Sequence, residues 1–577
     1  MKKIIHILIA CGTLAMSGCI EETFPTEFAT ESQVAESPMA LNALVSAIPT
    51  AMIGWENEAM ELCNYPGLCA AFEEMTEDVV IAGYTGYNTW ATYSRMSNPT
   101  HVRQNYAWYM YYAYIKNTNN VIGLIDAGTQ DRTQQTYLGI AHAFRAFYYL
   151  NMVRMFEYKY TPYCPPENDG VYGLGVPIVT EETTEEQAKN NPRVTVAENY
   201  EMIFADLAKA EEYLKGYVQT AKSFPSLACV YGLYARAWLE RGTAGVAGAY
   251  EKAAEYARRA INECGYTPMT QEKWQDPVNG FNDADFQNWM WGVCITPDNV
   301  SMMGDSFYGL LMVEQTWTAY GWRVGRSASR KFYEAIPDND FRKYSWLDPV
   351  FYAYGDRPVS NSYNGHEYKL AMPADEIRKG ITVASQFYGL PWIYNPIKFR
   401  PADNGWGTQS VGAAMDYPIM RVEEMYLIEA EAVARTKGVS DGIRLLNDFM
   451  RYRIFEGSYD CAPKSGDLES FVTELIFQKR VEFWGEGVNY YDAKRLALGL
   501  HRGYKGINAS QYFVTYDLDG IFPLWNCRIP ESEKQGNPAM ILNPTPLTAV
   551  ALDLYWAKSN ADLTRYYGCD LNNPDGE

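Results

Sequence analysis

Two glutamates four positions apart, Glu482 and Glu486, have the type and spacing that could perform chemistry. On one helical face their carboxylates would lie about 6 Å apart, close to the separations that glycosidases use for acid and base catalysis. Glycines at 485 and 487 break this segment, and basic residues surround it, namely Lys479, Arg480, Lys494 and Arg495. Ion-pair networks are far commoner than catalytic pairs, so we predict a salt-bridged helical elbow and no enzymatic activity.

Other acidic residues with helical spacing receive the same structural interpretation, namely Glu423, Glu424, Glu429 and Glu431. The sequence contains no nucleophile elbow, phosphate-binding loop or metal motif. Its five histidines share no ligand spacing with a cysteine, so no zinc site is predicted. We expect no catalytic residue, no metal and no cofactor.

Aromatic side chains are stronger candidates for function, because the chain holds 46 Tyr and 15 Trp against 23 Phe. Both types pair an apolar ring with a polar group and tolerate half-exposed positions. Sugars stack C–H patches on such rings, while asparagine or arginine meets their hydroxyls. Two loop-like segments supply the candidate glycan-binding residues, which are Tyr84, Tyr87, Asn88, Trp90 and Arg95 in the first and Trp317, Tyr320 and Trp322 in the second.

The alternative for these aromatic residues is that their rings only pack the irregular half of the chain. We adopt that interpretation for Trp289 and Trp291, which lie on or beside a strand-like run. These two tryptophans are therefore predicted to be core residues.

The N-terminus has the parts of a signal peptide: two lysines, an apolar run and small residues before a cysteine. Ser17 and Gly18 directly ahead of Cys19 resemble a bacterial lipobox, so residues 1–18 are predicted to be removed and Cys19 to be acylated. The alternative is ordinary secretory cleavage, with the cysteine incidental. Residues 19–40 are predicted to form a solvated tether. No later stretch is apolar enough to span a bilayer, so acyl chains would hold the protein.

A formal net charge of −21 argues against nucleic acid and anionic lipid headgroups as ligands. A neutral ligand is easier to reconcile with this charge. Beyond Cys11 and Cys19 nine cysteines remain, without C-x-x-C spacing, so no disulfide framework is predicted. Cys63 and Cys69 are close enough in sequence to pair locally, but a reduced, buried thiol is the expected state for most of the nine.

Apolar residues recur at steps of three and four along several segments, which predicts amphipathic helices. In the N-terminal half these segments are 137–155, 200–214, 228–238 and 250–261, of which the second and third are predicted to pair as a hairpin. From 268 to 417 the sequence is rich in Gly, Pro, Asn and Trp, with short β-like runs. Helical periodicity then returns in 419–435, 441–452 and 468–484.

The predicted fold is mainly α. Small residues at helix contacts, with aromatic residues between them, resemble the tetratricopeptide pattern, although no regular 34-residue period is found. Ordinary helices of an unrelated all-α protein are the alternative. We predict an N-terminal helical region at 41–267 and an irregular, loop-rich region with short strands at 268–577, packed together as one body.

Several segments resemble the SusD/RagB family and occur in the family's order. The most diagnostic are Asp416 to Ala432, Lys479 to Gly487 and Tyr491 to Arg495. Further matching segments are Gly139 to Arg154, Gly175 to Glu181, Arg193 to Tyr200, Asp340-Phe-Arg-Lys343 and Ile529 to Glu533. The resemblance covers the chain from the lipobox nearly to the C-terminus.

This resemblance implies a SusD-like, cell-surface lipoprotein of the outer membrane, anchored in its lipid and facing the exterior. It implies capture of an oligosaccharide or polysaccharide for carbohydrate uptake, and a SusC-like TonB-dependent transporter as partner. Import of peptides is the alternative within the same family, because the fold alone does not choose the ligand. A glycosidase is the third class, and hydrolysis of polysaccharides would separate it from both binders.

Overall fold

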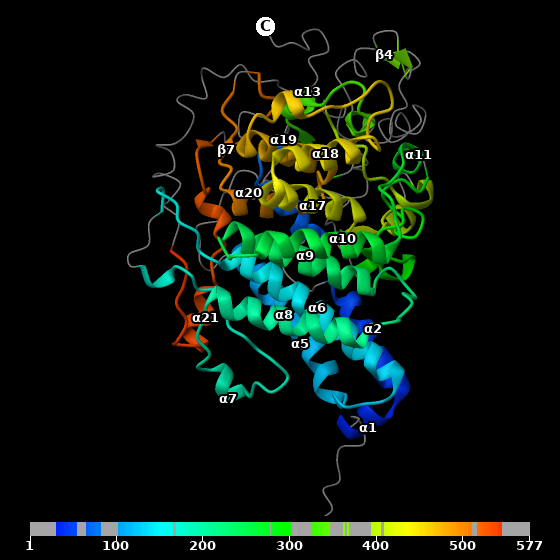
Figure 1. Cartoon of the computed structure of the whole chain (residues 1–577). Helices are drawn as coiled ribbons and strands as arrows, with labels where there is room; N and C mark the ends of the chain where they lie inside the picture. Colours follow the sequence, from blue (N-terminus) through cyan, green and yellow to red (C-terminus); the bar gives the residue numbers. More distant parts are fainter. Residues whose placement is uncertain are drawn as a thin grey trace, which may run out of the picture.

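The computed structural model in Figure 1 consists mainly of helices joined by long loops. It describes residues 31–54, 65–81, 102–164, 169–276, 278–302, 311, 326–346, 362–363, 366–367, 394–405, 409–504, 506–509 and 516–544. Its longer helices are α2 (Pro38–Ala51), α3 (Tyr65–Glu73), α5 (Val102–Leu124), α6 (Arg132–Phe156), α8 (Val196–Tyr213), α9 (Leu227–Thr243), α10 (Ala249–Cys264), α17 (Val422–Lys437), α18 (Val439–Met450), α19 (Leu468–Glu482) and α20 (Asn489–Leu496).

Short elements fill the loop-rich parts. The short helices are α1 (Glu31–Glu36), α7 (Glu185–Ala188), α11 (Gln271–Trp274), α13 (Arg330–Ala335), α16 (Gln409–Gly412) and α21 (Glu531–Gly536). The strands are β1 (Val79–Ile81), β2 (Trp291–Val293), β3 (Arg326–Ala328), β4 (Ser362–Tyr363), β5 (His366–Glu367), β6 (Tyr417–Met420), β7 (Leu500–His501) and β8 (Asp517–Leu518). They pair as β1 with β3, β2 with β6, β4 with β5 and β7 with β8, always antiparallel.

The long helices stack in layers, with α5, α6 and α8 below, α9 and α10 in the middle, and α17, α18 and α19 above (Figure 1). Neighbours in this stack contact one another: α6 with α5 and α8, α9 with α10, α10 with α17, and α17 with α18. Helix α8 also contacts α9 across the predicted turn. The predicted mainly α fold, with an irregular C-terminal half, is therefore confirmed.

Capping residues in the sequence set several helix ends. The Thr195 hydroxyl accepts a hydrogen bond from the Glu198 amide, and the Thr195 amide donates one to the Glu198 carboxylate, a capping box that begins α8. Asp467 begins α19 in the same way. Gly265 ends α10 with φ +65°, in the left-handed region that glycine adopts at little cost. These ends agree closely with the predicted helices.

Helix α6 differs from its prediction because it is buried all round, not along one stripe. Every residue from Leu138 to Val153 is buried. The reason is its central place, since α2, α5, α8, α9 and α20 all contact it. Helices covered on every side need no polar face.

Within the predicted tether, α1 and the start of α2 occupy residues 31–40. The Ser37 side chain accepts a hydrogen bond from the Ala40 amide, and Pro38 stands at the first helical position. Both features favour a helix start here. The rest of the predicted tether, and the signal peptide, lie outside the described residues.

The helix predicted from residue 419 begins instead at Val422, because β6 occupies Tyr417–Met420. This strand pairs with β2, and the Met290 amide donates to the Met420 carbonyl at 3.1 Å. The pairing joins the N-terminal edge of the irregular region to the start of α17. Long-range pairing of this kind leaves no signal in local periodicity.

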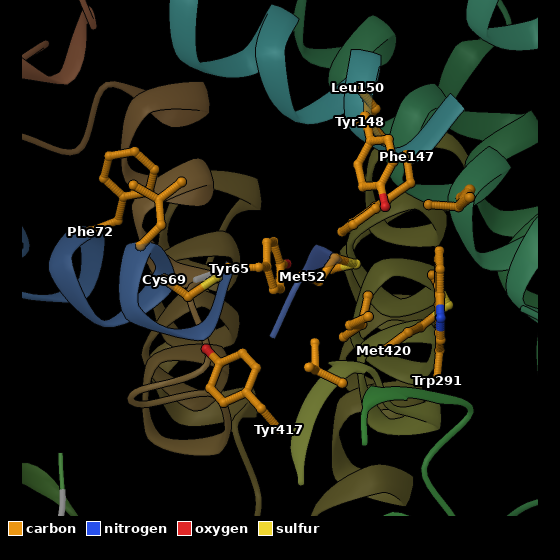
Figure 2. Packing of buried hydrophobic residues seen from close by; sticks show 14 of the residues in the cluster. Met52, Tyr65, Cys69, Phe72, Phe147, Tyr148, Leu150, Trp291, Tyr417 and Met420 are labelled. Carbon is orange, nitrogen blue, oxygen red and sulfur yellow. The ribbon is translucent and has the colours of Figure 1, made fainter. Parts of the chain in front are cut away.

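The largest hydrophobic cluster includes Trp289 and Trp291, which are buried as predicted. The Trp291 ring lies 4.9 Å from that of Phe144 and 5.0 Å from that of Phe147, between centroids. Figure 2 shows Trp291 beside Met420, with Phe147 and Tyr148 of α6 facing the same space. Strand β2 thus packs directly on the central helix.

Seven described cysteines are reduced, in agreement with the expected state: Cys69, Cys164, Cys229, Cys264, Cys294, Cys461 and Cys527. Five of them are buried. Cys63 lies outside the described residues. Among the helices that the structure describes, none has the length and hydropathy to cross a bilayer.

Candidate functional site

Every predicted site residue lies outside the described residues. This applies to Cys19, to Tyr84, Tyr87, Asn88, Trp90 and Arg95, and to Trp317, Tyr320 and Trp322. The residues that flank the two aromatic segments are described. They show from which elements the segments start.

Strands β1 and β3 flank the two aromatic segments and pair with each other. The first segment follows Ile81, the last residue of β1, and the second ends just before Arg326, the first residue of β3. Ile81 and Arg326 are register partners in this antiparallel sheet. Partner Cα atoms in such sheets lie about 4.5–5.5 Å apart. One segment therefore leaves the sheet where the other enters it.

Buried contacts hold this sheet on one side. Val80 and Ile81 are fully buried and cluster with Ile507 and Ala509. Arg326 is 2% exposed, and its Nε donates to Glu74 Oε1 at 2.7 Å. A buried charge pair of this kind needs good geometry to offset the loss of hydration.

Arg502 ties the loop before β1 to the same body. Its guanidinium donates to the Glu74 carbonyl at 2.5 Å and, from Nε, to the Thr76 carbonyl at 3.1 Å. Further along, Arg480 of α19 donates to Asp78 at 2.7 Å and to Glu77 at 2.8 Å. Burial raises the pKa of Asp78 in spite of this pairing.

The far end of β3 is fixed as well. The Ala328 amide donates to the Tyr394 carbonyl at 3.0 Å, and the Ser329 amide donates to the Asp78 carbonyl at 2.9 Å. Asn508 donates to the Ala328 carbonyl at 3.0 Å and accepts from the Arg330 amide at 2.7 Å. The sheet is a fixed base from which both aromatic segments extend.

Glu482 and Glu486 do not share a helical face, so the arrangement considered for catalysis is absent. Helix α19 ends at Glu482, and Gly485 and Gly487 follow with φ of +81° and +72°. These left-handed residues turn the chain, so Glu486 lies beyond the helix. The predicted elbow itself is confirmed.

Arginines distant in sequence surround Glu482. Its carboxylate accepts from Arg453 Nε at 2.7 Å, from Arg342 Nη1 at 3.0 Å and from Arg421 Nη1 at 3.0 Å. Glu486 accepts from Lys398 at 2.6 Å and shares Arg421, which donates at 2.8 Å. All of these side chains are buried.

The basic residues near the elbow, which the sequence suggested as partners, bind elsewhere. Lys479 pairs with Asp492, Arg480 with Glu77 and Asp78, and Arg495 with Glu431. Lys494 donates to the Met155 carbonyl at 2.7 Å. Lys494 and Arg495 belong to α20, and Arg480 stands two positions before Glu482, a spacing at which helical side chains do not face each other.

The environment of Glu482 excludes acid catalysis by this side chain. Burial alone would raise its pKa, but Arg453, Arg421 and Arg342 outweigh burial and hold the pKa below its usual range. Its carboxylate is therefore ionised, and the side chain is 0% exposed. A general acid needs a proton and access to substrate, and Glu482 has neither.

The other four acidic residues singled out in the sequence are also in ion pairs, as predicted. Glu424 binds Arg236 and Glu429 binds Arg258. Glu423 binds Arg453, and Glu431 binds Arg495. Sequence reasoning missed most of the cations. Arg342 and Arg421 lie within quoted motifs, but Arg453 and Lys398 carry no local signal. Within the described part of the chain, no group of three or more acidic, His or Cys side chains could hold a metal ion.

Comparison with solved structures shows the same fold. A SusD-like carbohydrate binding protein from Bacteroides vulgatus has 20% sequence identity, covers 87% of this chain and 96% of its own, and gives a TM-score of 0.63. A SusD superfamily protein from Bacteroides thetaiotaomicron has 19% identity, with 87% and 99% covered and a TM-score of 0.61. A SusD-like protein from Bacteroides fragilis has 17% identity, with 90% and 98% covered and a TM-score of 0.60.

Family comparison extends this result to the sequence. A family model described as starch-binding and associating with the outer membrane matches residues 38–239, and the SusD family model matches residues 253–550. No curated protein matches the chain. The second match alone spans more than half of the sequence. The chain therefore belongs to the SusD family.

Proposed function

We propose that this protein is a lipid-anchored receptor on the outer face of the outer membrane. It captures an oligosaccharide or polysaccharide through aromatic side chains of the two segments that extend from β1 and β3. It then delivers the glycan to a SusC-like TonB-dependent transporter. The observation that carries the glycan site is the register pairing of Ile81 with Arg326, which brings the bases of both segments together.

Short chain distances support a shared binding face. Tyr84 stands three positions after Ile81, and Trp322 stands four positions before Arg326. A chain spans at most about 3.3–3.6 Å per residue, so the Cα atoms of Tyr84 and Trp322 lie within about 15 Å of the sheet edge. Such a distance permits both rings to contact one oligosaccharide.

Charge and burial favour binding of a neutral glycan without hydrolysis. The net charge of −21 disfavours polyanions. Glu482 and Glu486, the pair considered for glycosidase chemistry, are buried and bound to cations. Half-exposed aromatic residues bind sugars by stacking and need no catalytic carboxylate.

Affinity electrophoresis of the soluble Cys19→Ala protein tests this function, with starch, dextran, xylan, mannan and galactan in separate gels. We expect at least one neutral polysaccharide to retard the protein, and its chain length to stay unchanged after long incubation. Shortening of the polysaccharide would assign an enzyme instead. Binding of an oligopeptide mixture without retardation by any glycan would assign peptide import.

Transfer to a partner needs its own measurement. The acylated protein is purified from outer membranes in mild detergent. We expect a TonB-dependent transporter to co-purify with it in stoichiometric amount. Mass spectrometry of the purified complex identifies that partner. A protein that purifies alone, at full acylation, would contradict the proposed delivery step.

A further inference from the structure

The helical half contains a cleft of about 510 Å³, away from the aromatic segments in sequence. Its lining comes from the α8–α9 loop, the start of α9, the end of α10 and the loop before β2. This volume falls within the range of about 300–1,000 Å³ that small-molecule sites occupy. No residue of this cleft is among the predicted site residues.

Two half-buried tyrosines line the cleft, Tyr217 and Tyr266. Gly265, with φ +65°, reverses the chain at the end of α10 immediately before Tyr266. The Lys222 ammonium group donates to the Tyr266 hydroxyl at 2.6 Å and lies 4.6 Å from its ring centroid. Lys222 is 8% exposed, so its charge is fixed in the cleft wall.

The wall that carries Lys222 is rigid. Its carbonyl accepts from the Gly292 amide at 3.0 Å, and the Ser223 carbonyl accepts from Trp291 Nε1 at 3.1 Å. Gln219 donates to the Met290 carbonyl at 3.0 Å. A wall held by the neighbouring strand loses little entropy when a ligand binds.

The residues with hydrogen-bond donors lie in the α8–α9 loop and at the start of α9. Besides Lys222, Leu227 and Ala228 line the cleft, and their amides begin α9, where Ser226 provides no side-chain cap. These amides have no acceptor within the described residues, as is usual for the first turn of a helix. The donors alone would suit an anion.

The residues with hydrogen-bond acceptors lie at the end of α10 and in the loop before β2. Glu263 at the end of α10 and Asp285 before β2 line the cleft, together with Asn288. None of these three side chains makes a hydrogen bond or ion pair with another residue that the structure describes. Two carboxylates oppose an anion, and the Lys222 ammonium group opposes a simple amine. Hydroxyl groups both donate and accept, so they satisfy both sets.

We infer that this cleft is a second glycan site, which binds a pyranose unit of a neutral saccharide between Tyr217, Tyr266 and the polar groups described above. It is independent of the site on the β1–β3 segments, although its ligand class is the same. A polymer long enough to reach both sites would be held more tightly than by either one.

The test uses a protein in which the first site is removed, the full chain with Cys19→Ala, Trp90→Ala and Trp322→Ala. Saturation-transfer NMR is recorded with the methyl pyranosides of glucose, galactose, mannose and xylose at millimolar concentration. We expect transfer to at least one of them, and a loss of affinity of about 5- to 150-fold when Tyr266→Ala is added. Tyr160→Ala removes a 65% exposed ring outside the cleft and should change nothing.

Two further variants keep the result decisive. If Tyr266→Ala lowers the melting temperature, Glu263→Gln with Asp285→Asn replaces it, because both residues are exposed. This pair should weaken binding about 2- to 10-fold. No transfer to any pyranoside, or transfer unchanged by the cleft variants, would overturn the second site. Because the first site is absent, this outcome is independent of the proposed function.

Discussion

Arg453 donates from Nε to Glu482 Oε2 at 2.7 Å, and neither side chain is exposed to solvent. Arg342 and Arg421 bind the same carboxylate, so one negative charge lies among three buried guanidinium groups. This cluster joins the residue before α17, the loop after α18 and the short 3-10 turn after α13 to the end of α19. Because the cluster links elements that are distant in sequence, we infer that its role is to stabilise the fold.

Replacement of Glu482 tests that assignment. Glu482→Gln leaves three buried arginines without their shared anion, and breaking a buried pair costs about 3–5 kcal/mol. We expect the free energy of unfolding in denaturant to fall by this amount while glycan affinity stays close to that of the parent. Glu185→Gln, which removes an exposed pair with Lys189, should change stability by less than about 0.5 kcal/mol. Unchanged stability with abolished binding would reverse the assignment.

Acid should destabilise the protein through the carboxylates whose pKa is lowered. Burial raises the pKa of Asp492, but Lys479 and Arg495 outweigh it and lower the pKa to about 2. The pKa of Glu482 is lowered in the same way, by the arginines around it. Below the pKa of the unfolded groups, 3.8 and 4.5, the unfolded chain binds protons that the folded chain does not.

The stabilisation from these two groups is therefore complete above about pH 4.5 and disappears as the pH falls toward 2. Melting temperatures measured at successive pH values through this window should fall steeply in the parent protein. Glu482→Gln should show a shallower decline, since part of the proton linkage is gone. Parallel curves for the two proteins would contradict the assignment.

Glu73 should have the opposite pH dependence. Burial and the nearby Asp78 charge raise its pKa from 4.5 to about 8, although Asn489 donates hydrogen bonds to it. Between these values the folded state retains a proton that the unfolded state loses, so stability falls as the pH rises. In Glu73→Gln the side chain keeps nearly the same shape but cannot ionise.

We expect Glu73→Gln to stabilise the protein on the order of 3 kcal/mol near neutral pH and to have little effect near pH 4.5. Chemical unfolding at the two pH values measures the difference. Glu482→Gln is the matched comparison, because it replaces a buried glutamate whose pKa is lowered. A stability loss for Glu73→Gln at neutral pH would show that the carboxylate is ionised and paired.

Much of the helical scaffold could be predicted from local patterns. The capping box at Thr195, the alanines of α10 and Gly265 lie within a few residues of the elements that they define, and those elements were found. The predicted burial of Trp289 and Trp291 is confirmed for the same reason, since a strand-like apolar run needs cover on both faces.

Features that depend on distant residues could not be predicted. Strand β6 forms because β2 pairs with it, and Arg453 reaches Glu482 because α18 and α19 contact each other. Local periodicity gives no information on either contact. The β1–β3 pairing could not be predicted for the same reason, because its two strands are distant in sequence. Chemical composition suggested both aromatic segments, but only the register of Ile81 with Arg326 relates them in space.

Membrane attachment should depend on Cys19. Cys19→Ala is expected to leave a folded protein that moves from the membrane fraction to the soluble fraction, because acyl chains provide the proposed anchor. Fractionation with immunoblotting measures this, and an unchanged melting temperature of the released protein shows that it is folded. Retention of the variant in membranes would contradict lipid anchoring.

The most direct measurement is the glycan affinity of Trp90→Ala and Trp322→Ala, taken together with their melting temperatures. We expect each variant to lose about 5- to 150-fold in affinity for the polysaccharide that the parent binds, with nearly unchanged melting. Trp291→Ala, which empties a buried site, should instead cost about 3–5 kcal/mol of stability. If Trp90→Ala and Trp322→Ala bind normally, or melt as early as Trp291→Ala, the proposed site on the β1–β3 segments is wrong.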